Sequence, residues 1–141
     1  MVWASADPIL FRIRVKKMTD KATSLIRQMA AQIPSLVAAA VVHLEDGLSI
    51  AEVSNRDDIN AGAASAYLAT IVQSNLQALK TLADGQVTDN ILITTDQYYF
   101  LIHHNYQRPY FLFVMSQKDG WIGQARLVME KYNTLMERFL G

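Results

Sequence analysis

Cysteine is absent from the 141-residue chain. Its absence excludes disulfide bonds and thiolate metal sites, including the zinc-deaminase site in which His-x-Glu is completed by two cysteines. His43 and Glu45 have the His-x-Glu spacing, but the cysteine half of that site is missing. His103 and His104 are adjacent on an expected strand, where neighbouring side chains point to opposite faces. We therefore predict that the protein binds no metal and no cofactor.

Long hydrophobic runs are also absent. No segment approaches the roughly 18 consecutive apolar residues of a transmembrane helix, and no basic stretch followed by an apolar one opens the chain as in a signal peptide. These absences predict a cytoplasmic protein with no membrane span. Charged residues make up only 18% of the chain and hydrophobic residues 51%. A partner surface is one place for this apolar excess.

Net charge is zero, because 13 lysines and arginines balance 13 aspartates and glutamates. The first 17 residues carry +3, which leaves −3 on the rest of the chain. The basic residues in this first segment are Arg12, Arg14, Lys16 and Lys17, against Asp7. Nucleic acid is not an expected partner, since phosphate binding needs a basic face on the folded body.

Residues 1–17 read as a flexible basic arm ahead of a single domain at residues 18–141. The arm opens with alanine, serine, aspartate and proline, and helical periodicity is clear only after it. Two alternatives stay open for the arm. Its basic residues can contact an acidic surface, or its alternating apolar and basic residues 9–15 can form an edge strand.

Motifs of catalysis are missing as well. No glycine-rich loop leads from a strand into a helix to hold a phosphate, and no Gly-x-Ser-x-Gly is present. The acids are scattered over expected turns and helix starts. Only His43 and Glu45 share one face of an expected strand, so we do not expect an enzyme.

Hydrophobic periodicity predicts eight elements in the order α-β-β-α-β-β-β-α, which is an α+β arrangement within the broad α/β class. The first helix is expected to be capped by Thr19 or Asp20 and to end before Pro34. Its apolar face consists of Ala22, Leu25, Ile26, Met29 and Ile33. The last helix is expected from residue 122, after three apolar runs that predict a meander.

The segment at residues 40–52 predicts a hairpin. Asp46 and Gly47 separate two apolar runs, and Asp-Gly is typical of a type I′ turn. The first of these runs is apolar on both faces, which indicates cover on both sides of the sheet. After the second run, Asp57 and Asp58 are expected to open a helix that continues to about Leu82.

This central helix is the most informative segment, because residues 59–79 contain no charged residue. The face expected on the sheet consists of Ala61, Ala64, Leu68, Ile71, Val72, Leu76, Leu79 and Leu82. The opposite face consists of Ile59, Gly62, Ala63, Ala66, Thr70, Gln73 and Gln77. That second face is small and neutral, so a partner can approach closely with little desolvation of charge. An ordinary exposed face on an alanine-rich helix is the alternative.

Three motifs, taken in order, resemble the roadblock/dynein light chain superfamily in its bacterial form. They are Ile33-Pro34-Ser35 before the first strand, Asp46-Gly47-Leu48 with Ile50-Ala51 in the hairpin, and Gly123, Ala125, Arg126 and Leu127 in the last helix. The similarity runs from about Met18 to Leu140. It departs at Ser35, where the family often has glycine, and it does not cover residues 1–17.

The resemblance implies a three-layer sandwich, with a five-stranded antiparallel sheet between the central helix on one face and the two terminal helices on the other. It also implies a homodimer in which the third strands pair edge to edge, through Ile91 and Ile93, and the central helices lie side by side. Family members are non-catalytic platforms for small Ras-like GTPases, and a bacterial branch stimulates GTP hydrolysis in polarity and motility systems. The implied function is a scaffold or regulator of a small GTPase. A small-molecule sensor of the PAS or GAF kind is the alternative that the predicted elements leave open.

Overall fold

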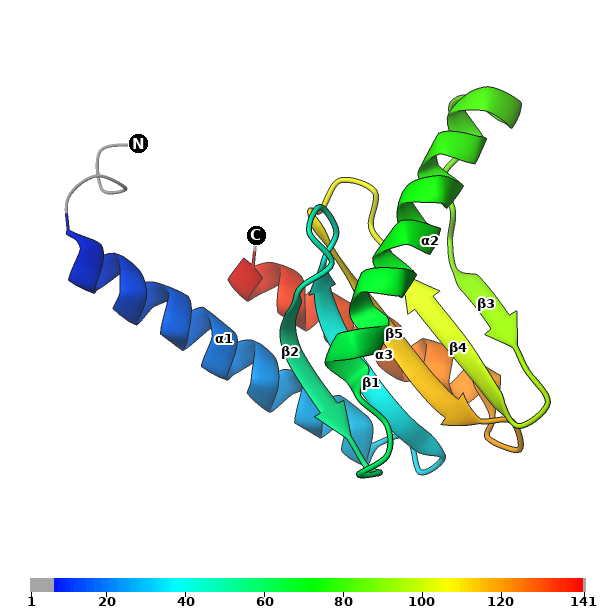
Figure 1. Cartoon of the computed structure of the whole chain (residues 1–141), viewed down its shortest axis with the longest axis horizontal. Coiled ribbons are helices and arrows are strands. Elements are labelled where there is room, and N and C mark those ends of the chain that lie inside the picture. The colour runs from blue at the N-terminus through cyan, green and yellow to red at the C-terminus, as the bar shows by residue number, and fades with distance from the viewer. Residues whose placement is uncertain (1–6, 141) are drawn as a thin grey trace.

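A computed structural model describes residues 7–140 as one sheet covered by helices on both faces (Figure 1). The helices are α1 (Pro8–Ala31), α2 (Ala61–Leu82) and α3 (Ile122–Leu140). The strands are β1 (Leu36–His43), β2 (Ser49–Ser54), β3 (Ile91–Thr94), β4 (Tyr98–His103) and β5 (Tyr110–Gln117). The predicted element order and fold class are confirmed.

The five strands form one antiparallel sheet in the order β2-β1-β5-β4-β3. The two central neighbours, β1 and β5, are buried along almost their whole length. Their near-continuous apolar sequences suit strands that are covered on both faces. β2 and β3 are the two edges of the sheet, so each has one side without a strand neighbour in the chain.

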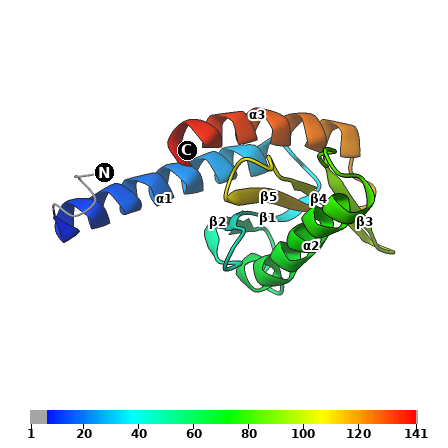
Figure 2. The same ribbon diagram turned by 90° about the horizontal axis from the view of Figure 1, so that it is seen from above.

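The three layers are clearest from above, where α1 and α3 lie over one face of the sheet and α2 lies over the other (Figure 2). Alternate residues of β1 and β5 point into the two layers, as the pleat requires. Val41 and Leu112, for example, face the layer of α1 and α3, whereas Val42 and Phe111 face α2. The apolar positions predicted for the first helix are all buried, which confirms that assignment: Ala22, Leu25, Ile26, Met29 and Ile33.

The start of α1 corrects the sequence interpretation. Asp7 is the N-cap and accepts a hydrogen bond from the Ile9 N–H at 2.9 Å, while Pro8 occupies the first turn. This Asp-Pro pair is a strong helix start, so the helix begins at Pro8, eleven residues before Thr19. The alternative of an edge strand at residues 9–15 is wrong, and the part of the arm from residue 8 onward is helical.

The β1–β2 hairpin is confirmed, but its turn is longer than predicted. A type I′ turn needs a positive φ at both of its central residues, here Asp46 and Gly47. Gly47 has a φ of +73°, but no residue other than glycine has a positive φ among residues 7–140. The turn is therefore not of type I′. The loop instead closes through hydrogen bonds from the Gly47 N–H to the His43 carbonyl at 2.9 Å and from the His43 N–H to the Leu48 carbonyl at 2.8 Å.

The start of α2 also differs from the prediction. Asn60, not Asp57 or Asp58, is the N-cap, and its side-chain oxygen accepts from the Ala63 N–H at 3.1 Å. Asp58 is held by the Arg56 guanidinium at 2.6 Å. This pairing lowers the pKa of the Asp58 carboxyl. No helix within residues 7–140 is both long and apolar enough to cross a bilayer.

We expect a shortened chain that begins at Met18 to keep the fold. None of the side chains at residues 8–17 is buried, so their removal leaves both layers of the core intact. Thr19 or Asp20 can then serve as the new N-cap. Thermal unfolding followed by circular dichroism should show a midpoint within a few degrees of the full chain. A shift of many degrees, or an insoluble product, would make the arm part of the folded unit.

Candidate interaction surface

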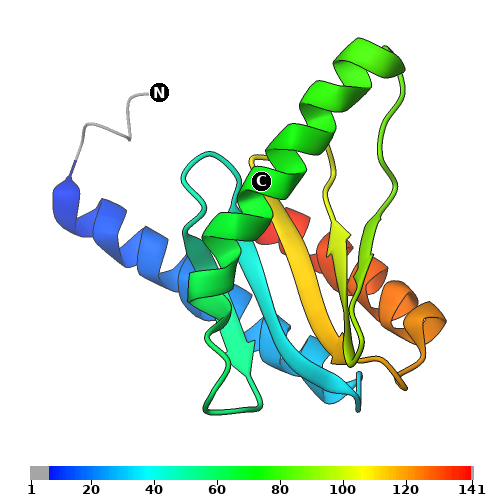
Figure 3. The same cartoon turned by 45° about the vertical axis from the view of Figure 1, so that its right-hand side comes forward.

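The first half of α2 lies on the sheet, and its second half projects past the ends of the strands (Figures 1 and 3). All five buried residues of the helix fall within its first twelve residues: Ala61, Ser65, Leu68, Ala69 and Val72. Two residues that the helical wheel assigned to the sheet are therefore exposed. Ile71 is 37% exposed and Leu82 is 83% exposed. The assignment of these two residues was wrong. Ile71 lies on a flank of the helix, one residue before the buried Val72, and Leu82 lies beyond the last buried residue.

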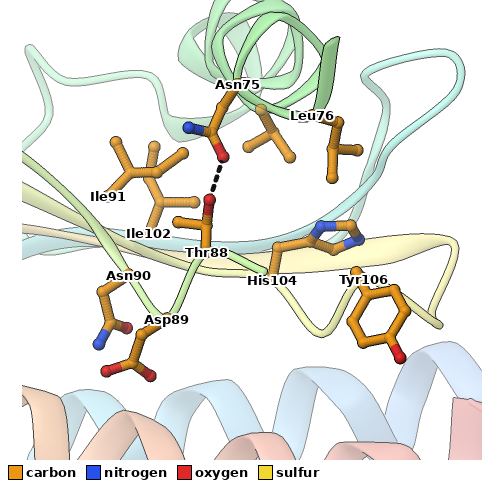
Figure 4. A pocket seen from close by; sticks show the side chains of 10 residues that line it. Asn75, Leu76, Thr88, Asp89, Asn90, Ile91, Ile102, His104 and Tyr106 are labelled. Carbon is orange, nitrogen blue, oxygen red and sulfur yellow. Dashed lines mark hydrogen bonds between the residues drawn. The ribbon is translucent and has the colours of Figure 1, made fainter. Parts of the chain in front are cut away.

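Two hydrogen bonds define the flanks of α2. The Gln73 amide donates to the Leu44 carbonyl at 2.7 Å, which marks the flank beside the β1–β2 hairpin. The Thr88 hydroxyl donates to the Asn75 side-chain oxygen, which marks the flank beside β3 and the loop before it (Figure 4). The buried residues of α2 form the side of the helix that faces the sheet. This side and the two flanks leave a fourth side, the outer face, which points away from the molecule.

The hairpin flank holds three of the residues predicted to form an interface. Gly62 lies where a Cβ would come within 2.7 Å of the Glu52 carboxylate, and Ala66 lies against Gly47 of the hairpin turn. Gln73 is on the same flank through its bond to Leu44. These three positions line the contact between α2 and the hairpin, although Ala66 and Gln73 remain exposed.

The outer face holds three more of the predicted residues, Ala63, Thr70 and Gln77, and all three are exposed. They form an uncharged row along the helix, as the sequence indicated. Ile59 does not belong to this row, because it precedes the helix and packs against the core layer beneath α2. Its expected place on the exposed face is therefore corrected.

The flank beside β3 carries a stripe that the sequence interpretation missed. Four residues at helical spacing, together with Asn75, form what we call the edge-side stripe: Tyr67, Ile71, Asn75, Ala78 and Leu82. Tyr67 is 78% exposed, and Ala78 is exposed as well. Large apolar side chains in a row, left in water by the single chain, make this stripe a candidate contact surface.

β3 lies on the same side of α2 as this stripe, because the loop before β3 and Ile91 border Asn75. Ile91 and Ile93 are half-buried and pack on the α2 side of the sheet, whereas Leu92 points to the other side and is exposed. The two isoleucines predicted for the interface are thus on the same side of the sheet as the edge-side stripe. An edge strand with free backbone groups is a template for pairing with another strand.

The histidines do not converge on a catalytic or metal site. His43 contacts Asp46 at 3.2 Å, while Glu45 is exposed. A hydrogen bond from the Leu48 N–H, helped by His43, lowers the pKa of the Asp46 carboxyl. Residues 7–140 contain no group of three or more histidine, aspartate or glutamate side chains placed to hold a metal ion.

His103 and His104 diverge as the strand geometry predicted. His103 contacts the Asn90 side chain at 3.2 Å, whereas the His104 Nε2–H donates to the Arg108 carbonyl at 2.9 Å. Burial lowers the pKa of His104, with its hydrogen bond to Arg108 opposing the shift. Its ring is therefore neutral at neutral pH and fills space beneath α2.

A cavity between α2 and the end of β4 bears on the sensor alternative. It is lined by residues that include Val72, Leu76, Ile102 and His104, and its volume is about 10 Å³ (Figure 4). That space accommodates about one water molecule. Ligand pockets are usually at least about 300 Å³, so this cavity is too small for the ligand of a PAS or GAF sensor, and the hollows of about 320–360 Å³ lie open on the surface rather than in the core.

The chain has the fold of roadblock proteins. No family model and no curated protein match its sequence. The structure is similar to a Roadblock/LC7 domain from Streptomyces avermitilis, with a TM-score of 0.75 at 14% identity over 84% of this chain and 96% of that one. It is also similar to MglB from Myxococcus xanthus (TM-score 0.68, 15% identity, 89% of each chain) and to the gliding protein MglB from Thermus thermophilus (0.70, 13%, 87% and 90%). The fold implied by the sequence resemblance is confirmed.

Proposed function

We propose, from the roadblock fold and the uncharged exposed faces of α2, that this protein is a non-catalytic homodimeric scaffold and regulator of a small Ras-like GTPase. The observation that carries the proposal is the absence of charge along residues 61–79 of a helix whose outer half is in water. Such a surface does not improve the solubility of a monomer. In an interface it favours binding, because little charge is desolvated and the partner can approach closely.

In the proposed dimer, β3 pairs with β3 of a second copy and the edge-side stripes meet above the joined sheet. Ile91 and Ile93 then extend the apolar layer under the paired helices. Both halves of this surface lie on the same side of the molecule, so one two-fold axis serves the strands and the helices together. Dimerisation covers Tyr67 and Ile71 and pairs the free edge of β3.

The outer face of α2 stays in water in this dimer and supplies the partner surface. Ala63, Thr70 and Gln77 from both copies form a neutral, low-relief platform. The sequence resemblance implies a small GTPase as the occupant, because family members serve as platforms for such proteins. Stimulation of hydrolysis would act through the switch loops of the GTPase, since the platform offers no titratable side chain. We place the complex in the cytoplasm.

The test uses the small Ras-like GTPase encoded nearest to this gene, loaded with a non-hydrolysable GTP analogue or with GDP. We expect calorimetric titration to show at least tenfold tighter binding to one nucleotide state. A regulator shifts a switch only through differential affinity for its two conformations. Equal affinities for the two nucleotide states would mean that the protein only tethers the GTPase and does not regulate it. No binding in either state would contradict the proposed partner.

A pair of threonine substitutions locates the binding surface. Thr70→Glu puts a charge on the outer face of α2 and should abolish measurable binding, because an unpaired charge buried in an interface costs several kcal/mol. Thr134→Glu puts the same charge on an exposed position of α3 and should leave the affinity unchanged. Equal effects of the two substitutions would place the partner elsewhere.

A further inference from the structure

The first ten residues of α1 form an arm that extends beyond the rest of the molecule. Figures 1 and 2 show this part of the helix projecting past the sheet and past the end of α3. Five large apolar residues on it are exposed: Ile9 66%, Leu10 62%, Phe11 50%, Ile13 46% and Val15 44%. No other helix of the described chain carries so many in so short a stretch.

The apolar side chains of the arm lie on every side of the helix. Successive residues are about 100° apart, so Ile9, Leu10 and Phe11 surround the first turn. Phe11 and Val15 continue the row that enters the core as Ala22 and Leu25. Ile13 lies on the opposite side. A protein groove covers one face of a helix and would leave the other faces in water.

The charges of the arm are all of one sign. Residues 8–17 contain four basic residues and no acid, and all four are exposed: Arg12, Arg14, Lys16 and Lys17. Asp7 is engaged as the N-cap. This charge disfavours pairing of the arm with the arm of a second copy, because such a pair would bring eight positive charges together. The matching surface must be anionic and must also accept apolar side chains.

We propose that this arm binds the surface of an anionic phospholipid bilayer. The interfacial layer accepts a helix to a depth of about 5–10 Å, comparable to the width of a helix, so it can surround the arm on several sides. The apolar side chains reach the acyl boundary, and the basic ones meet the lipid phosphates. The arm thus brings the α2 and β3 surfaces to a membrane.

The test is co-sedimentation of the untagged full chain with vesicles. We expect binding to vesicles that contain phosphatidylglycerol, much weaker binding to vesicles of phosphatidylcholine alone, and release in 1 M salt, where the Debye length is about 3 Å. The triple substitution Ile9→Ser, Leu10→Ser, Phe11→Ser should weaken binding about a hundredfold by removing apolar insertion. The charge variant Arg12→Gln, Lys16→Gln, Lys17→Gln should also weaken it about a hundredfold.

The matched control is Leu127→Ser, which removes an exposed apolar side chain from α3 and should bind vesicles like the unaltered chain. Because no substituted residue is buried, circular dichroism should show all variants folded. Failure of the unaltered chain to bind anionic vesicles would overturn the proposal, and so would equal binding by the serine variant. If the arm instead binds an acidic protein, the unaltered chain should fail to bind anionic vesicles. These outcomes leave the dimer and GTPase proposals unaffected, since those rest on α2 and β3.

Discussion

A glutamate in place of Ile71 is expected to convert the proposed dimer into a folded monomer. Ile71 lies in the middle of the edge-side stripe, on the flank of α2 toward β3, and more than a third of it is in water in the single chain. Glutamate is a good helix former, so α2 should persist with a loss of a few tenths of a kcal/mol in helix propensity. Removal of the partly buried isoleucine should lower the stability of the subunit by about 1 kcal/mol.

The effect on association should be much larger than the effect on folding. In a two-fold pair of α2 helices, the substitution places two carboxylates near the axis and removes both from water. A buried unpaired charge costs several kcal/mol, which raises a dissociation constant at least a hundredfold. Light scattering after gel filtration at micromolar concentration should therefore report the mass of one subunit. Circular dichroism provides the folding control.

Ala66→Glu is the control on the opposite flank of the same helix. Ala66 is exposed and lies against Gly47, on the hairpin flank away from β3. We expect this variant to remain dimeric and to bind the GTPase more weakly, because the outer platform begins beside it. If Ile71→Glu stays dimeric while Ala66→Glu dissociates, the helices pair through the hairpin flank and the proposed use of β3 is wrong. If both variants stay dimeric, α2 is not the dimer contact.

The element types were predictable because local patterns and tertiary packing agree in most of this chain. The near-continuous apolar runs predicted two buried strands, and these are the central strands β1 and β5. The helical spacing of Ala125, Met129 and Tyr132 predicted the face of α3 that is buried in the core. In each case the period of the pattern identifies the element and the apolar positions identify its buried face. The hairpin around Gly47 was predictable from turn chemistry, although the length of its loop was not.

The start of α1 was missed because exposed residues carry no amphipathic pattern. The arm is apolar on all sides with basic residues between, so its period suited a strand as well as a helix. The informative signal was the pair Asp7 and Pro8, an N-cap followed by a first-turn proline. A cap specifies where a helix begins even when no core contact stabilises the residues that follow it.

The interaction surface was only partly predictable. An uncharged helix can be recognised from sequence, and it led to the exposed residues Ala63, Ala66 and Thr70. Periodicity alone cannot show where a helix leaves its sheet or how wide its buried face is, so Leu82 and Ile71 were assigned to the core. It also cannot show which flank lies beside an edge strand, because strand order is a property of the whole sheet. Recognition of the edge-side stripe required both the course of α2 over the sheet and the strand order.

The substitution with the largest expected effect on folding lies at a tight contact between two turns that are distant in sequence. Gly120 follows β5 and lies against the residue that precedes β1. A Cβ on Gly120 would come within 2.0 Å of the Ser35 hydroxyl and 2.9 Å of the Ser116 hydroxyl. Those two hydroxyls are 2.6 Å apart, and Ser116 is fully buried. The serine at position 35, where the resembling family often has glycine, thus takes up space that a side chain at position 120 would need.

Gly120→Ala is therefore expected to destabilise the protein by about 2–4 kcal/mol, which combines overpacking with loss of the hydrogen bond between Ser35 and Ser116. For a domain of this size the melting temperature should fall by about ten degrees. Gly123→Ala is the matched control, because only the Trp121 ring nitrogen, at 3.7 Å, lies near its Cβ position. Alanine there favours α3 and should leave the melting temperature equal or slightly higher.

The double variant Ser35→Gly, Gly120→Ala tests the cause of this effect. Ser35→Gly alone should cost about 1 kcal/mol through the lost hydrogen bond and the added chain entropy. In its background the clashing hydroxyl and Cβ are gone, so Gly120→Ala should cost less than half of what it costs in the natural chain. All melting curves are compared at one protein concentration, because the proposed dimerisation would add to apparent stability. Additive effects of the two substitutions would show that the cost of Gly120→Ala comes from another contact, such as the Ser116 hydroxyl, rather than from Ser35.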